Sequence, residues 1–363
     1  MILYRYFGRR LLQSFGLTLV AFVLILGLID LVEQLRRHAG EGIPFGRIAG
    51  LTALNVPGSL YALLPLVTVL ATLAMFLSLS RSSEMVIARA AGRSAMRTLL
   101  VPMICVLLLG MGAVALLNPI AAATTARYHA LSNDLTGDVG TLSVAGEGLW
   151  LRQGNDDGQM VIRALRASAD GTELGEVTFM GFDGAGEPAM RIEAERAVLR
   201  DGAWQLATPK LWRLDTPNPE ALAESRDRMI LPTDLTAERI RDSFAAPDLV
   251  PVWELPAFIE RLERAGFSSQ PHRMRLWTEV AMPVFMVAMA MIAASFTMQH
   301  TRVSRTGLMV LSALLTGFGL YFVRNFAQVL GESGQLPVLL AAWAPPLAGL
   351  FLSVGLILHL EDG

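Results

Sequence analysis

Six long stretches without a charged residue divide the chain, and hydrophobic side chains dominate each of them. A helix needs roughly 17–25 apolar residues to cross the hydrocarbon core of a bilayer, so each stretch predicts a membrane-spanning helix. The stretches are Leu11–Ile29, Ile48–Ser80, Thr98–Ala126, Val280–Gln299, Thr306–Val323 and Ser333–Leu358. The pattern predicts a polytopic α-helical membrane protein with three spans in each half.

The block between the third and fourth stretches, Arg127–Glu279, has a different pattern. Short runs of alternating polar and apolar residues are separated by turn signals rich in Asp and Gly, as in successive antiparallel hairpins. The runs are Gly148–Arg152, Gln159–Arg163, Glu176–Phe182, Arg191–Leu199 and Ala203–Leu206, with turns at Asn155–Gly158, Asp170–Gly171, Asp183–Gly186 and Asp201–Gly202. The block is therefore expected to be an inserted all-β domain resembling a jelly roll.

These patterns predict four segments. Residues 1–126 hold the first three spans, 127–252 the β domain, 253–273 a connector, and 274–363 the last three spans. Within the connector, Glu254–Gly266 is expected to form a short amphipathic helix. The second span carries Pro57 and Pro65, which predict a bent or broken helix. A tilted helix with an interfacial first turn is the equal alternative.

Charge separates the two parts further. The 363 residues are 53% hydrophobic and 17% charged, with a net charge of −2. The central block carries −8 and the remainder +6. An acidic domain argues against a nucleic-acid partner, which needs a basic surface. Cys105 is the single cysteine, so the chain forms no internal disulfide.

Arginine placement predicts the orientation. If the N-terminus is cytoplasmic, the inside segments contain nine arginines and the short outside loops three, as the positive-inside rule requires. The inside set is Arg5, Arg9, Arg10, Arg81, Arg89, Arg93, Arg97, Arg302 and Arg305, and the outside set is Arg36, Arg37 and Arg47. Both termini are thus expected in the cytoplasm and the β domain outside it.

Motifs for catalysis are missing from the sequence. It contains no Gly-x-x-x-x-Gly-Lys-Ser/Thr loop, no His-Glu-x-x-His and no cysteine pair, so we expect no enzyme activity, no cofactor and no metal site. The deepest ionisable residues, Asp30, Glu279 and Arg324, fall near the ends of the apolar stretches. That placement favours energy supplied by another protein over ion-coupled transport.

The segment Arg81–Arg97, between the second and third spans, contains a possible docking helix. Ser82 or Ser83 can cap it, and Glu84 is favourable at its positive N-terminal end. Apolar and small surfaces follow, from Met85 and Val86 to Ala90 and Gly92. The alternative, which composition alone favours, is a basic loop lying on anionic lipid headgroups.

Several motifs resemble one family. The pattern Arg-Ser-x-Glu-Met-x-x-x-x-Ala-x-Gly from Arg81 to Gly92 is similar to the cytoplasmic signature of the LptF/LptG (YjgP/YjgQ) lipopolysaccharide export permeases. Further matches are Leu31–Arg37, Leu64-Pro65-Leu66 and Glu147–Trp150. The order of three spans, β domain and three spans is also the family's order, and the LptG branch is the more similar.

The resemblance implies an ATP-binding-cassette exporter that takes lipopolysaccharide from the outer leaflet of the bacterial inner membrane. Its implied partners are a paralogous LptF-like permease, a cytoplasmic ATPase homodimer, and periplasmic jelly-roll bridge proteins like LptC and LptA. It favours the docking helix over the headgroup-bound loop. The implied ATPase-coupling residues are Arg81, Ser83, Glu84, Met85, Val86, Ala90 and Gly92.

The resemblance also suggests substrate contacts. Family members often have lysine near the end of span one, where this chain has Asp30, so Arg36 and Arg37 are the expected contacts for lipid phosphates. Their alternative is an ordinary headgroup contact or a salt bridge to Glu33 or Glu41. The candidates for acyl-chain contact are Phe22 and Leu26 on span one and Phe318, Phe322 and Phe326 on span five, with ordinary bundle or lipid packing as the alternative.

Two other functions compete with this one. A membrane-anchored scaffold whose β domain recruits other proteins is the first, and an exporter of another amphipathic lipid is the second. A scaffold needs neither six spans nor a cytoplasmic docking helix, which argues against the first function. The second function differs only in the lipid exported, and apolar pockets discriminate poorly among acyl chains.

Overall fold

The computed structural model consists of two compact units. One contains residues 1–129, 251–253 and 273–363, and the other contains 130–250 and 254–272. The residues described are 2–39, 43–81, 95–136, 142–145, 148–155, 158–168, 171–183, 187–200, 202–214, 216, 218–233, 235–236, 240, 247–264, 268–297 and 306–361.

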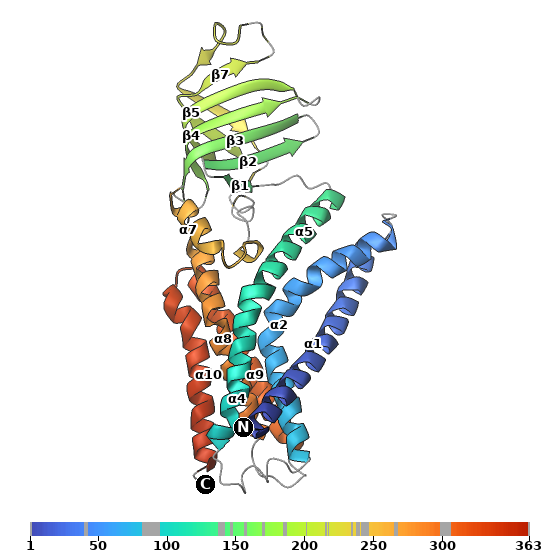
Figure 1. Ribbon diagram of the computed structural model, residues 1–363. Coiled ribbons are helices and arrows are strands. Elements are labelled where there is room, and N and C mark those ends of the chain that lie inside the picture. The colour runs from blue at the N-terminus through green and yellow to red at the C-terminus, as the bar shows by residue number, and fades with distance from the viewer. Residues whose placement is uncertain are drawn as a thin grey trace. The chain divides into compact units, whose positions relative to one another are not determined.

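Six helices of the first unit are long and apolar enough to cross a membrane (Figure 1). The third span is one continuous run of α4, a π-helical turn η1, and α5. The helices are α1 (Ile2–Arg37), α2 (Phe45–Arg81), α4 (Ala95–Gly112), η1 (Ala113–Leu117), α5 (Asn118–Thr136), α8 (Gln270–Thr297), α9 (Thr306–Glu332) and α10 (Val338–Glu361). The predicted helical membrane fold is confirmed.

The six spans are buried to very different extents. In α8, 78% of the most apolar 18-residue stretch is buried within the chain, whereas in α1 none of it is. Close packing around α8 depends on Gly110 of α4, where a Cβ atom would lie 2.7 Å from the Cα of Pro283. Because α8 is central and α1 peripheral, lipid or another protein must cover most of α1.

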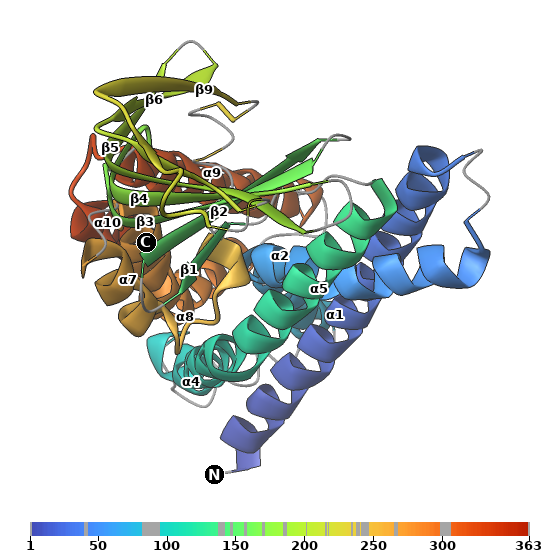
Figure 2. The ribbon, with the colours of Figure 1, turned by 90° about the horizontal axis from the view of Figure 1, so that it is seen from above.

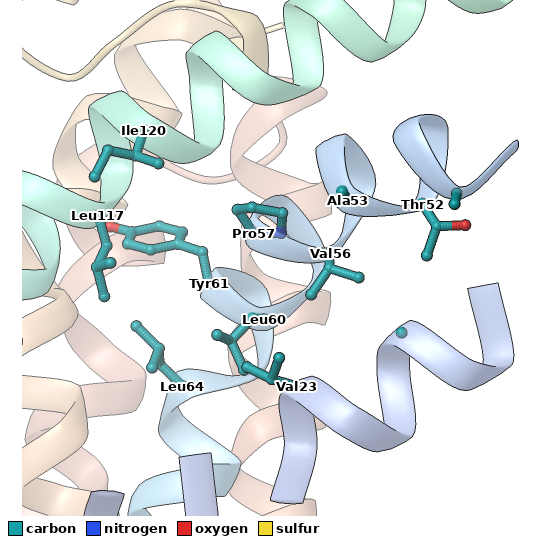
Figure 3. Close-up of a pocket in the computed structure, with 12 residues that line it drawn as sticks. Val23, Thr52, Ala53, Val56, Pro57, Leu60, Tyr61, Leu64, Leu117 and Ile120 are labelled. Atoms are coloured by element: carbon teal, nitrogen blue, oxygen red, sulfur yellow. The ribbon is translucent and has the colours of Figure 1, made fainter. Parts of the chain in front are cut away.

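The second span is bent rather than broken. Pro57 and Pro65 both lie inside the single helix α2, which changes direction close to Pro57 (Figure 3). Proline lacks the N–H that would bond to the carbonyl four residues earlier, so the helix loses one hydrogen bond there and bends.

The second unit contains an antiparallel sheet in which successive strands pair in the order β1-β2-β3-β4-β5-β6-β9. The far edge of β5 is shared, since Arg196–Arg200 pair with β6 and Met190–Glu193 pair with β7. The strands are β1 (Leu142–Ala145), β2 (Gly148–Asn155), β3 (Gly158–Ala167), β4 (Glu173–Phe182), β5 (Pro188–Arg200), β6 (Ala203–Ala207), β7 (Lys210–Arg213), β8 (Glu224–Ser225) and β9 (Arg228–Pro232). All five predicted strands are present, and the inserted β domain is confirmed.

One face of this sheet forms the core of the second unit. Ile162, Phe179 and Ile192 are direct cross-strand neighbours on β3, β4 and β5, and all three are fully buried. Trp204 on β6 is also fully buried, and its ring and that of Phe179 pack in a T-shaped arrangement. Helix α7 (Leu255–Arg264) follows the sheet in sequence and lies within the segment 254–266 that was predicted to be a short amphipathic helix. Its buried side chains are Leu255, Phe258 and Leu262.

Candidate functional site

A cavity of about 540 Å³ lies between α1, α2 and the third span. Figure 2 shows α1, α2 and α5 side by side, and Figure 3 shows the cavity wall. Its lining is almost wholly apolar and consists of Val23, Gly27, Ala49, Thr52, Ala53, Val56, Pro57, Leu60, Tyr61, Leu64, Leu117 and Ile120. A cavity with such walls, in a membrane-spanning bundle, suits a hydrocarbon chain rather than water.

Two polar contacts join α1 to its neighbours close to this cavity. The Asn55 amide of α2 donates to the carboxylate of Asp30 at 2.6 Å, and Gln34 donates to the hydroxyl of Tyr128 at 2.8 Å. Asp30 directly follows the apolar run of α1, so it marks the end of the hydrocarbon-spanning part of that helix. The cavity wall on α1, at Val23 and Gly27, therefore belongs to the apolar part.

The two arginines predicted to meet lipid phosphates follow on the same helix. Arg36 and Arg37 both form ion pairs with Glu33, at 3.0 and 2.8 Å. This is one of the alternatives that the sequence left open. Both guanidinium groups nevertheless remain on the surface, because their side chains are 76% and 60% exposed. The ion pairs leave room for further hydrogen bonds to an anionic group.

The predicted acyl-chain contacts fall into two sets. Phe22 and Leu26 are half-buried on α1. Phe318, Phe322 and Phe326 are 45%, 69% and 68% exposed, and their four-residue spacing gives one stripe along α9. The α9 stripe is thus a free apolar surface of this chain, and none of these five residues lines the cavity of Figure 3.

The predicted ATPase-coupling residues cannot be placed. Ser83, Glu84, Met85, Val86, Ala90 and Gly92 lie outside the described residues, and Arg81 is described only as the last residue of α2. Their role remains a prediction from the sequence.

A buried set of polar residues was missed by the sequence analysis. Glu279 was expected at a span end because an apolar run starts at Val280, but it lies a third of the way along α8 and is 2% exposed. It accepts a hydrogen bond from the Tyr61 hydroxyl of α2 and forms an ion pair with Arg275 at 2.9 Å. Among the described residues no three His, Cys, Asp or Glu side chains cluster as a metal site.

Arg324 also lies inside its helix, about two thirds of the way along α9. Its guanidinium group is 5.1 Å from the centre of the Phe285 ring of α8, and 3.9 Å separates its Nη2 from the sulfur of Met282. Burying these charges is costly unless they are partnered, so the contacts tie α2, α8 and α9 into one specific arrangement.

The third span is joined to residues 251–253, a short stretch of the first unit that lies in sequence between the two parts of the second unit, 130–250 and 254–272. The buried Asn118 side chain accepts a hydrogen bond from the Val252 amide at 2.9 Å. The Trp253 indole N–H donates to the carbonyl of Ala115 at 3.2 Å. Pro119 explains the second contact, because proline cannot donate to the carbonyl four residues before it. The Asn118-Pro119 pair was the available sequence signal.

Comparison with known proteins identifies the family. The family model described as "Lipopolysaccharide export system permease LptF/LptG" matches residues 5–359, nearly the whole chain. The chain belongs to the LptF/LptG family. It is 26% identical over 371 residues to the LptG permease of Escherichia coli K12, covering 99% of this chain and 98% of that protein. It is 22% identical to LptG of Haemophilus influenzae, covering 94% of each.

Both relatives are LptG proteins, in agreement with the branch that the motifs favoured. Members of the LptF/LptG family are permease subunits rather than enzymes.

Proposed function

We propose that this chain is the LptG-like permease of an exporter that extracts lipopolysaccharide from the outer leaflet of the inner membrane. The full-length family match carries the proposal. The apolar cavity beside α1 supports it, because a lipid exporter must give hydrocarbon chains a place within the protein. ATP is hydrolysed by a separate cytoplasmic homodimer.

A paralogous LptF-like permease is the proposed neighbour in the membrane. The apolar stretch of α1, in which no side chain is fully buried, and the phenylalanine stripe of α9 are the surfaces that support this partner. Between the two permeases, Phe22, Leu26, Phe318, Phe322 and Phe326 would contact acyl chains. The β domain would pass the lipid on to LptC-like and LptA-like jelly-roll proteins.

ATP-dependent lipid release tests this function against its two rivals. Proteoliposomes that contain the chain with its partner permease and ATPase should release lipopolysaccharide to an added bridge protein only when ATP is present. A scaffold would release no lipid. An exporter of another lipid would release that lipid and leave lipopolysaccharide in the vesicle.

The orientation predicts the outcome of a reporter experiment. Both termini are proposed to be cytoplasmic and the β domain periplasmic, because arginines concentrate in the inside segments. A phosphatase reporter fused after residue 200 should be active in the periplasm, and one fused after Gly363 should be inactive. The opposite pattern would end the exporter proposal.

Reversing the charge of Glu84 should uncouple the ATPase. Glu84 is the acid that starts the predicted coupling helix, and an exposed ion pair contributes only about 1 kcal/mol. Glu84→Arg adds repulsion to that loss, so we expect ATPase association to weaken by about tenfold or more. Pull-down and lipid-release assays measure it, with Glu84→Gln as the milder comparison. Normal release by Glu84→Arg would refute the coupling role.

Reversing Arg36 and Arg37 should weaken substrate capture. Guanidinium groups form paired, charge-assisted hydrogen bonds with phosphate oxygens, so the Arg36→Glu, Arg37→Glu variant should retain about tenfold less lipopolysaccharide. Mass spectrometry of the purified complex measures the retained lipid. Glu33→Gln is the matched control, because it removes the partner that both arginines share. It should bind lipid at least as well as wild type. If the charge-reversed variant retains as much lipopolysaccharide as wild type, the two arginines do not contact the lipid phosphates.

A further inference from the structure

The cavity beside α1 has a polar end. Figure 3 shows Thr52 at one end of its wall. On α1, Val23 and Gly27 line the cavity, and Asp30 follows three residues after Gly27 on the same face of the helix. Asn55, one turn from Thr52 on α2, donates to Asp30, so Asp30 and Thr52 lie at the same end. The cavity therefore runs from a polar end into an apolar interior.

Two oxygen atoms at this end have no hydrogen-bond partner within the part of the chain that the structure describes. They are Oγ1 of Thr52, a residue only 8% exposed, and Oδ2 of Asp30, whose other oxygen accepts from Asn55. By contrast, the hydroxyl of Thr68, also on α2, donates to the carbonyl of Leu64. Buried polar atoms are nearly always paired, because an unpaired one has lost its hydrogen bonds to water. The two oxygens therefore call for the polar group of a ligand.

The cavity is open to the side of the bundle. Val23 of α1 is 37% exposed, and Leu117 and Ile120 of the third span are 39% and 51% exposed. A hydrocarbon chain can thus enter between α1 and the third span while the rest of its lipid stays in the membrane. The volume of about 540 Å³ is that of a pocket for one small ligand, so the cavity takes a single chain rather than a whole lipid with several chains.

The unpaired oxygens select the chemistry of that chain. A carboxylate oxygen only accepts hydrogen bonds, so Asp30 needs a donor, whereas the Thr52 hydroxyl either accepts or donates. The donor must lie where the hydrocarbon ends, because Asp30 marks the end of the apolar run of α1. The ester-linked chain of a phospholipid has only acceptor oxygens at that point. An amide-linked or hydroxylated acyl chain has an N–H or O–H donor there.

We propose that this cavity binds one amide-linked or hydroxylated acyl chain, a class that includes the chains of lipids with N-acylated sugars. Asp30 and Thr52 are the residues that distinguish this chain from the ester-linked chain of a phospholipid. The inference rests on the proposed exporter function and adds a means by which the exporter selects its lipid. Apolar walls alone discriminate poorly among chains, whereas a buried polar group that one ligand pairs and another leaves unpaired discriminates well.

Competition between two lipids with the same headgroup tests the selectivity. The purified complex of the chain with its partner permease and ATPase is incubated with equal amounts of ceramide phosphoethanolamine and phosphatidylethanolamine. The first has an amide N–H and a hydroxyl where the second has two esters. Mass spectrometry of the bound lipid should show that wild type prefers the amide lipid about tenfold, as expected for one net hydrogen bond.

Asp30→Asn reverses the chemistry with little change in shape. Its amide oxygen still accepts from Asn55, but an amide N–H replaces Oδ2 and turns an acceptor into a donor. The preference for the amide lipid should be lost. Thr52→Val should reduce the preference about threefold. Thr68→Val, its matched control on α2, should leave the preference unchanged, because the hydroxyl of Thr68 is already paired within the helix.

Gly27→Leu tests the cavity itself. A Cβ atom at Gly27 would lie 3.9 Å from its nearest neighbour, a side-chain carbon of Val56, so a larger side chain fits there and fills the cavity. This variant should bind about tenfold less of the amide lipid. Gly16→Leu is the matched control on α1, since Gly16 does not line the cavity and a Cβ atom there meets no described atom within 4 Å.

The outcomes separate the two proposals. A wild-type complex that releases no lipopolysaccharide with ATP would refute the exporter function. If wild type releases lipopolysaccharide but shows no preference for the amide lipid, or if Asp30→Asn keeps the preference, the selective site is refuted and the exporter stands. Equal binding by Gly27→Leu and Gly16→Leu would also refute the site.

Discussion

Glu279→Leu should strongly destabilise the membrane unit. It removes the partner of Arg275 and the acceptor of Tyr61 at a position only 2% exposed. Removing one partner of a buried ion pair costs on the order of 3–5 kcal/mol. We expect a value near the lower end here, because the side chain of the remaining Arg275 is 23% exposed. The melting temperature of the purified protein should fall accordingly.

A double variant distinguishes lost pairing from lost packing. Replacing both Arg275 and Glu279 with leucine removes both charges, and apolar replacement of a buried pair is often close to neutral. We expect the double variant to melt above Glu279→Leu. Glu332→Gln, at the end of α9, should leave the melting temperature unchanged. A Glu279→Leu protein as stable as wild type would show that this carboxylate has no structural role.

Trp204→Ala should unfold the β domain while the six spans remain in the membrane. Trp204 is fully buried and packs edge-on against Phe179 at the centre of the sheet. Deleting a core tryptophan costs about 3–5 kcal/mol, a large share of the stability of an ordinary domain. Limited proteolysis of the full chain should cut the insert rapidly in this variant and slowly in wild type.

Ile230→Ala is the control for that experiment. Ile230 lies on β9, which pairs with β6, the strand of Trp204, but its side chain is 69% exposed. Its removal should change the cleavage rate little. Equal protection of the Trp204→Ala and wild-type inserts would mean that the sheet does not depend on this side chain.

The β domain could be predicted from the sequence because its signals are local. Alternation along a strand places Ile162, Phe179 and Ile192 on one face whatever the rest of the chain does. The glycines of two predicted turns, Gly171 and Gly202, adopt positive φ angles of 70° and 73°, as tight turns between strands require.

The polar interior could not be predicted, because its partners are distant. Counting uncharged residues placed Glu279 at a membrane boundary, because the apolar run starts at Val280. Helix α8 begins well before that run, at Gln270, so Glu279 lies inside the helix. Glu279 is tolerated there because Arg275 forms an ion pair with it and because Tyr61, 218 residues away, donates to it. Similarly, the free carbonyl created by Pro119 could be inferred, but Trp253 as its partner could not. Such contacts follow from the fold, not from any window of sequence.

The contact between Trp253 and Ala115 has a consequence for the order of assembly. Its two residues are 138 positions apart, and strands β1 to β9 are all synthesised between them. The third span is therefore synthesised before Trp253, and until then the carbonyl of Ala115 has no indole N–H to accept from. The membrane bundle reaches its final packing only after the insert has been translated and the returning chain has met the π-helical turn. A truncated chain that ends before residue 251 cannot acquire this contact, even though it contains three complete spans.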